Sequence, residues 1–213
     1  MSCEYIAQGI EHSLDLLHTA WRNIFACHHS LEATFEHSWN LLSERERITY
    51  RKLSVFQGGF SQEAAQQVVG ASLPLLSALV DKSMLRCDFS GWYSLHPLLH
   101  QYAAQKLNQL PEEAQQTQAK HTQYYMIFLQ EREAAIKGKR QKGAIDEIAR
   151  EPDNIHAAWN WAVSHREDDL LSPALECLFY FCESRSLMHD GERFMGQIAE
   201  TFQEEKFCLG EEH

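Results

Sequence analysis

The sequence predicts a mainly α protein that contains one small β-hairpin. Glycine and proline are scarce, with 10 and 5 among 213 residues, so few breaks are expected in its helices. Apolar residues recur at helical spacing through most of the chain, as they do in helices that bury one face. Alternation typical of β-strands occurs clearly in one stretch alone, around residue 90.

The first two helices are expected within residues 1–42. A stripe of apolar side chains follows residues 6–24 at helical spacing, and a break follows at 27–30. Ser30 is the expected N-cap of a second helix over 31–42, because a serine oxygen accepts a hydrogen bond from the free N–H groups of a first helical turn.

A capping box opens the third expected helix. Ser43 and Glu46 stand three residues apart, so each side chain can bond the backbone N–H of the other residue. This helix should run to about Phe56. The glycine pair at 58–59 is expected to end it.

Two short helices come next. Ser61 is the expected N-cap of a helix over 62–69, which Gly70 closes, since glycine readily adopts the left-handed conformation found after a helix. A further helix is expected over 73–83, with Pro74 in its first turn, where proline is tolerated.

The β-hairpin is expected directly after these helices. Strand-like stretches at 84–89 and 92–95 flank Ser90 and Gly91, a candidate two-residue turn. Three short helices followed by a small hairpin is the element order of a winged helix.

The remainder predicts helices alone. Pro97 opens a helix that runs to about residue 107, and Pro111 marks the next start. The pattern of short antiparallel pairs suits a solenoid of helical hairpins. From Pro111 onward the helices are expected at 111–136, 140–150, 152–165, 169–186 and 189–205.

Composition narrows the class of protein. The net charge is −11, and most of it lies in residues 111–213, which carry 11 basic and 20 acidic residues. This charge disfavours a nucleic-acid partner there. No stretch is apolar enough to span a membrane, and the six cysteines lack metal-binding or paired spacing. We therefore expect a cytoplasmic protein with no membrane partner, in which the cysteines are buried thiols.

Four stretches resemble the lid, winged-helix and arm regions of bacterial STAND-class signalling ATPases, relatives of the NB-ARC proteins that include large LuxR-like and AfsR-like transcriptional regulators. The stretches are residues 28–65, 73–87 (LPLLSALVDKSMLRC), 92–107 (WYSLHPLLHQYAAQKL) and 151–163 (EPDNIHAAWNWAV).

The resemblance implies three domains. They are a helical lid-domain remnant at 1–42, a winged helix at 43–110 and a TPR-like arm at 111–213.

The family's catalytic motifs do not occur in this chain. No Gly-x-x-x-x-Gly-Lys-Ser/Thr loop is present to hold phosphates, and no apolar strand ends in the paired acids that would hold magnesium. We therefore expect no enzyme activity and no cofactor in this chain. The resemblance implies that ADP or ATP binds the intact parent protein, whose ATPase core is one partner. A protein or small inducer on the arm is the other expected partner.

His96 is the one candidate binding residue. It stands where the family has the histidine of a Met-His-Asp motif, which contacts the β-phosphate of ADP, although Pro97 replaces the aspartate here. The residues alone favour His96 as the N-cap of the following helix, because a residue before proline is biased to extended geometry. The phosphate contact is expected in the intact parent only.

Alternative functions have weaker support. His96 and His100 have a spacing that can bind zinc, but we expect no metal, since Pro97 occupies the glutamate position of a zinc-protease motif. The alternative reading of the whole chain is a DNA-binding winged-helix transcription factor domain with a helical dimerisation arm. Against it, the recognition helix expected at 73–83 lacks the basic and amide side chains that read base edges.

Overall fold

A computed structural model describes residues 35–185, 194 and 196. The chain divides into two compact units, residues 1–47 and 48–213, which we treat separately. The expected helices at 6–24 and 189–205 lie outside the described residues, as do the first residues of the helix expected at 31–42.

The prediction of a mainly α protein with a small sheet is confirmed, since helices and one three-stranded antiparallel sheet make up the described fold. Among the described residues, no helix is long and apolar enough to cross a membrane.

The capping box of the first unit forms as predicted. The Glu46 carboxylate accepts hydrogen bonds from the Ser43 N–H and O–H, both at 2.7 Å, and the Glu46 N–H donates to Ser43 Oγ at 3.4 Å. Residues 35–40 are helical, and the next helix is α2 (Glu44–Lys52). Its guanidinium at Arg47 donates to the Trp39 carbonyl at 3.0 Å.

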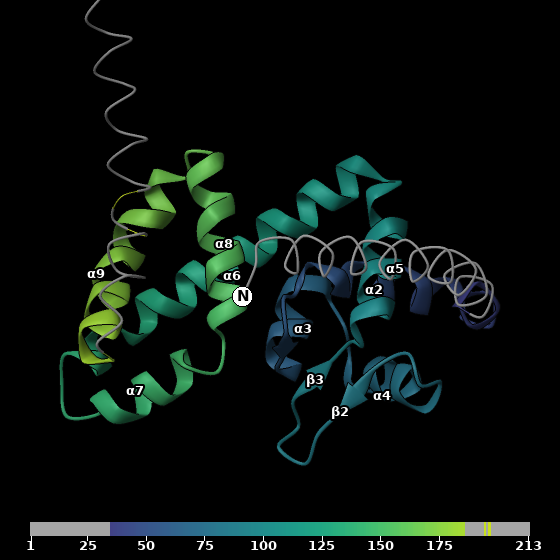
Figure 1. Cartoon of the computed structure of the whole chain (residues 1–213), viewed down its shortest axis with the longest axis horizontal. Coiled ribbons are helices and arrows are strands. Elements are labelled where there is room, and N and C mark those ends of the chain that lie inside the picture. The colour runs from purple at the N-terminus through teal and green to yellow at the C-terminus, as the bar shows by residue number, and fades with distance from the viewer. Residues whose placement is uncertain (1–34, 186–193, 195, 197–213) are drawn as a thin grey trace, which may run out of the picture. The chain divides into compact units, whose positions relative to one another are not determined.

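Residues 48–108 contain the small sheet, and we call them the sheet module. Its strands pair antiparallel in the order β1-β3-β2, and α3, α4 and α5 lie around them (Figure 1). The order of elements is helix, strand, two helices and a two-stranded hairpin. The elements after α2 are η1 (Leu53–Val55), β1 (Gly59–Phe60), α3 (Gln62–Val69), α4 (Leu73–Asp81), β2 (Arg86–Cys87), β3 (Tyr93–Ser94) and α5 (Pro97–Asn108).

The predicted caps of α3 are present. The Ala64 N–H donates to Ser61 Oγ at 3.1 Å, and Gly70 ends the helix with a φ of +73°. The helical turns end at Val55, before the glycine pair at 58–59, as predicted, but strand β1, which begins at Gly59, was not predicted.

The hairpin loop is also longer than the expected two residues. The Asp88 N–H bonds the Trp92 carbonyl at 2.9 Å, and the Gly91 N–H bonds the Asp88 carbonyl at 3.1 Å. Gly91 has a φ of +79°, so the loop is the three-residue type with glycine in its left-handed position. The Asp88 carboxylate holds it by accepting from the Ser90 and Trp92 N–H groups.

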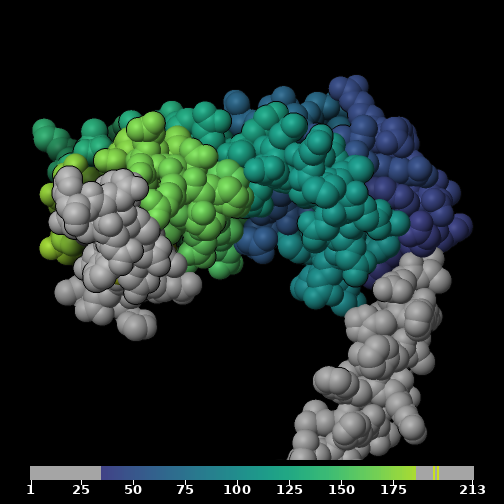
Figure 2. Space-filling model, turned by 90° about the horizontal axis from the view of Figure 1, so that it is seen from above, coloured from purple at the N-terminus to yellow at the C-terminus, as the bar shows by residue number. Residues whose placement is uncertain are grey.

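We call residues 111–185 the arm. Its longest helix, α6, contacts each of the other three helices, and in the space-filling view the green and yellow atoms of the arm form one continuous surface (Figure 2). Predicted helix bounds agree with the observed ones within two residues, and those of α6 agree at both ends. The helices are α6 (Pro111–Ile136), α7 (Gln141–Ile148), α8 (Pro152–Ser164) and α9 (Asp168–Ser184).

The cysteines follow the sequence prediction in part. Cys177 and Cys182 are buried in α9, as expected, but Cys87 is exposed on β2. The two-residue strand β2 has both of its side chains exposed, so no core is available to cover this thiol.

Candidate functional site at the junction of the sheet module and the arm

The side-chain amide of Asn154 connects the arm to the sheet module. Asn154 lies in the first turn of α8 and is 1% exposed. Its Oδ1 accepts from the Gln57 N–H at 2.7 Å, and its Nδ2 donates to the Gly59 carbonyl at 2.7 Å. The amide therefore pairs with the backbone on both sides of Gly58, as a neighbouring strand would.

The same amide also binds two side chains of the arm. Its Nδ2 donates to Glu151 Oε2 at 2.7 Å, and its Oδ1 lies 3.3 Å from His121 Nε2. Because an amide oxygen only accepts, His121 must carry its proton on Nε2. The two donors and two acceptor sites of Asn154 are thus all occupied. Tyr125 completes the cluster by donating its hydroxyl to Glu151 Oε2 at 2.8 Å.

Burial shifts the titration of both ionisable members of this cluster. Burial raises the pKa of Glu151 to about 7, against the opposing effect of the hydrogen bonds from Tyr125 and Asn154. Burial lowers the pKa of His121 to about 4, although its bond to Asn154 acts in the other direction. The imidazole is therefore neutral near pH 7, where the Glu151 carboxyl is close to half ionised.

An aromatic wall seals the cluster on the side of the sheet module. The rings of Phe56 and Phe60 stack with their centroids 4.4 Å apart. The Phe56 ring also packs edge-on against His121 and Tyr125, with centroid distances of 5.4 Å and 6.5 Å. Both phenylalanines are fully buried. This packing removes water from the polar cluster and so strengthens its hydrogen bonds.

Glycine is required at both positions of the loop that holds Asn154. Gly58 has a φ of +78°, and a Cβ there would lie 3.0 Å from Asp153 Oδ2. A Cβ on Gly59 would overlap the indole of Trp92. The left-handed backbone at Gly58 and the closeness of Trp92 to Gly59 therefore favour glycine at both positions.

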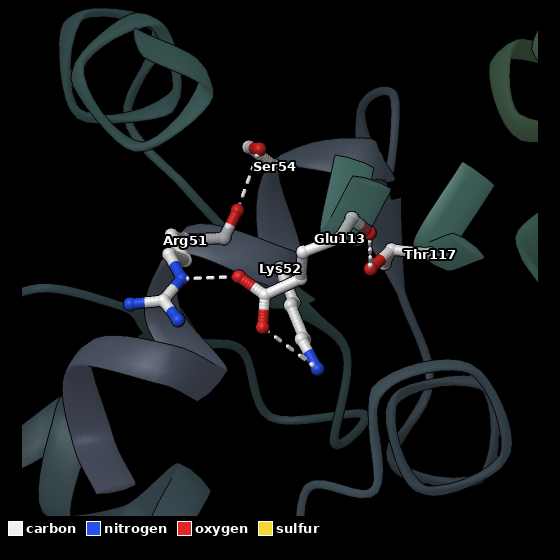
Figure 3. Close-up of polar contacts among 5 residues, drawn as sticks. All are labelled: Arg51, Lys52, Ser54, Glu113 and Thr117. Carbon is white, nitrogen blue, oxygen red and sulfur yellow. Dashed lines mark hydrogen bonds and ion pairs between the residues drawn. The ribbon is translucent and has the colours of Figure 1, made fainter. Parts of the chain in front are cut away.

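A second polar contact joins the same two parts at the start of α6 (Figure 3). The Glu113 carboxylate accepts from Arg51 Nε at 2.6 Å and lies 3.2 Å from Lys52 Nζ. Burial acts to raise the pKa of Glu113, but the bonds from Arg51 and Lys52 outweigh it and hold the pKa below its usual value. The Thr117 hydroxyl fixes the helix turn by donating to the Glu113 carbonyl at 2.7 Å.

The predicted site residue, His96, lies at the N-terminus of α5, apart from the hydrogen bonds of this cluster. It is exposed, and its Nδ1 accepts from the Leu98 N–H at 3.3 Å. His96 therefore caps α5, as the residues alone predict. His100 instead contacts the Phe56 carbonyl through Nε2 at 2.9 Å. Within the part of the chain that the structure describes, no three histidine, cysteine or acidic side chains gather as a metal site.

Helix α4, which covers most of the stretch 73–83 where a recognition helix is expected, contains no basic residue. Leu76 and Leu79 are buried in the module, and Leu73, Pro74 and Ser77 are exposed. The one ionised side chain within α4 is the acidic Asp81. Nothing on this helix offers a base-reading cation.

Sequence reasoning missed the cluster around Asn154. The stretch 151–163 stood out by its resemblance, but neither Glu151 nor Asn154 was assigned a chemical role. A partial signal was available, since Gly58-Gly59 marks a backbone that another group can approach closely. The partner was not identifiable, because Gln57 and Asn154 stand 97 residues apart.

Comparison with known proteins gives three relatives at 30% identity over 186 aligned residues. They are "Putative HTH-type transcriptional regulator Mb0914c" of Mycobacterium bovis and two proteins of Mycobacterium tuberculosis with the same description, MT0914 and Rv0890c. The alignment covers 83% of this chain and 20% of each relative, so the chain spans about a fifth of their length. No family model matches the chain, and no solved structure matches it.

Proposed function

We propose that this chain is a non-catalytic regulatory module of a STAND-type transcriptional regulator, in which the sheet module acts as the winged helix and is coupled to a sensor arm at Asn154. The names of the relatives support a role in transcriptional regulation. The coupling rests on one observation, the fully paired and buried Asn154 amide, which joins backbone of one part to side chains of the other.

In this proposal the junction transmits a change of state. An ATPase core in the full-length protein holds ADP, partly through the exposed Nε2 of His96, and this favours a closed arrangement. Binding of a protein or small inducer to the arm, together with exchange of ADP for ATP, opens this closed arrangement. Each ligand acts only through its different affinity for the two states, so a junction that couples them must change nucleotide affinity from a distance.

Isothermal titration of ADP into the full-length protein tests this coupling. Asn154→Ala should change ADP affinity, because the substitution uncouples the arm that biases the closed state. Gln105→Ala, an exposed amide on α5 that lies outside the groove described below, is the matched control. A folded Asn154→Ala protein with unchanged ADP affinity would show that the junction relays nothing.

The role of His96 is measured in the same titration. His96→Ala should weaken ADP binding by removing one phosphate contact. Full-length His96→Ala protein that holds ADP as tightly as wild type would exclude the phosphate role. The purified chain of 213 residues should hydrolyse ATP no faster than a buffer control, because it carries no phosphate-binding loop.

DNA binding by the sheet module is the second candidate, and the names of the relatives favour it. The absence of basic residues from α4 argues against it. A gel shift at low salt decides between the two, since contacts to phosphates depend steeply on salt. We expect this chain to cause no gel shift. Tight, salt-sensitive binding would instead favour direct DNA recognition over the proposed relay.

A further inference from the structure

A hollow lies beside the junction, between η1, α5, α6 and α8. Its volume is about 350 Å³, within the range of small-molecule sites. Val55 and Leu107 are buried beneath it, and Ala104 and Ala114 also line it. Both parts of the molecule that meet at Asn154 therefore contribute walls to this groove.

The polar lining of the groove is dominated by amides. The side chains of Gln57, Asn108, Gln115 and Gln118 all face it, and none of the four has a hydrogen-bond partner among the described residues. Each amide offers both donors and an acceptor. Among the described residues that line the groove, none is a lysine, arginine, aspartate or glutamate, so they offer neither a cation for a phosphate nor an anion for an ammonium group.

A flat aromatic surface completes the lining. The indole of Trp161 stacks with the imidazole of His165, with centroids 3.8 Å apart and planes 12° from parallel. The backbone fixes this pair, because His165 Nδ1 lies 2.9 Å from the Trp161 carbonyl. Trp161 remains partly exposed in the groove. Such a ring offers a stacking surface to a planar ligand.

We propose that this groove binds an uncharged planar heterocycle, a free nucleobase or its nucleoside. Paired donors and acceptors on glutamine and asparagine match the edges of bases, and the Trp161 ring supplies a stacking surface. The described lining residues include no lysine or arginine, and the nearby Arg51 and Lys52 are paired with Glu113, so the groove selects against the phosphorylated forms. Gln57 lies in the groove and also donates its N–H to Asn154, so a bound base would stabilise the segment that holds the junction.

Titration of the 213-residue chain with adenosine, guanosine, cytidine and uridine tests this site, with each 5′-monophosphate in parallel. Heat and tryptophan fluorescence are both recorded. We expect one nucleoside to bind, and its monophosphate to bind about tenfold more weakly because the phosphate loses water without gaining a partner. Absence of binding by every nucleoside, or equal binding of the monophosphates, would overturn the proposal.

Variants locate the site. Gln118→Leu should weaken binding by about tenfold, and Trp161→Leu should weaken it further and abolish the fluorescence response. Gln130→Leu, an exposed glutamine on the same helix but outside the groove, should bind as wild type does. Binding unaffected by Gln118→Leu in a folded chain would place the ligand elsewhere. Only the regulatory meaning of the groove rests on the proposed function, which the ADP titration of the full-length protein tests separately.

Discussion

Two polar contacts join the sheet module to the arm, and they differ in burial and in charge. Asn154 is buried, uncharged and fully paired, whereas Glu113 is an ionised group, 22% exposed, that lies between two cations. Solvent can replace the partners of Glu113 if the contact opens, whereas the Asn154 amide is 1% exposed and depends on its protein partners. The buried amide should therefore control the geometry of the junction, and the ion pair should add little free energy.

The largest effect is expected from Asn154→Ala. The change removes the side-chain partner of the Gln57 N–H, the Gly59 carbonyl and the His121 Nε2–H, while Glu151 keeps its bond from Tyr125. Since each unpaired buried group costs about 1–3 kcal/mol, the free energy of unfolding should fall by about 4 kcal/mol. Urea unfolding followed by circular dichroism measures it.

Two variants serve as controls for Asn154→Ala. Asn154→Asp keeps the acceptor oxygens but loses both N–H donors and places a second carboxylate beside Glu151, so it should destabilise at least as much. Asn108→Ala removes an exposed amide and should leave stability within about 0.5 kcal/mol of wild type. A loss under 1 kcal/mol in Asn154→Ala would mean that this amide does not hold the junction.

The second effect is on the pH dependence of stability. In the folded state the pKa of Glu151 is raised from 4.5 to about 7, so the folded chain binds more protons in that window and stability falls as pH rises through it. His121, with its pKa lowered from 6.5 to about 4, has the opposite effect between those values. The free energy of unfolding of the wild type should therefore vary little between about pH 4.5 and 6.5.

Glu151→Gln separates these opposing contributions. The variant lacks the Glu151 carboxyl, whose contribution to stability decreases as pH rises. Its free energy of unfolding relative to wild type should therefore rise by about 3 kcal/mol between pH 4.5 and 7. Urea unfolding at a series of pH values measures the difference. Glu112→Gln, at an exposed position of α6, controls for lost charge. Parallel curves for Glu151→Gln and wild type would contradict the raised pKa.

Local sequence signals were sufficient for the helices but not for the junction. Capping residues such as Ser43 and Ser61, and prolines such as Pro111, act on the backbone within a few residues, so the helix bounds could be predicted from them. Strand β1 was missed because a strand of two residues, Gly59 and Phe60, is too short to show an alternating pattern.

The hydrogen-bonding cluster could not be predicted for a different reason. Asn154, His121 and Gln57 come from separate stretches of the chain, and nothing in the sequence near any of them indicates its partners. His96 illustrates the reverse case. Its capping role depends only on Pro97 and the adjoining N–H of Leu98, so the residues alone predicted it.

The third effect is expected from Gly58→Ala, which tests the loop that holds Asn154. A left-handed φ of +78° and a Cβ 3.0 Å from Asp153 Oδ2 should together cost about 1–2 kcal/mol. Gly70→Ala is the matched control, because Gly70 is also left-handed, with a φ of +73°, but a Cβ there meets nothing. If both variants lose the same stability, the contact with Asp153 adds nothing to the backbone strain.

The smallest effect is expected from Glu113→Gln. The amide keeps a hydrogen bond to Arg51 but loses the charge that attracts Arg51 and Lys52, so the cost should be about 1 kcal/mol at low salt. Because mobile ions screen partly exposed charges, the difference from wild type should shrink as sodium chloride is raised towards 1 M. The effect of Asn154→Ala should keep its size over the same range, since no net charge is lost. If Glu113→Gln instead cost as much as Asn154→Ala and did so at every salt concentration, the ion pair would hold the junction on equal terms with the buried amide.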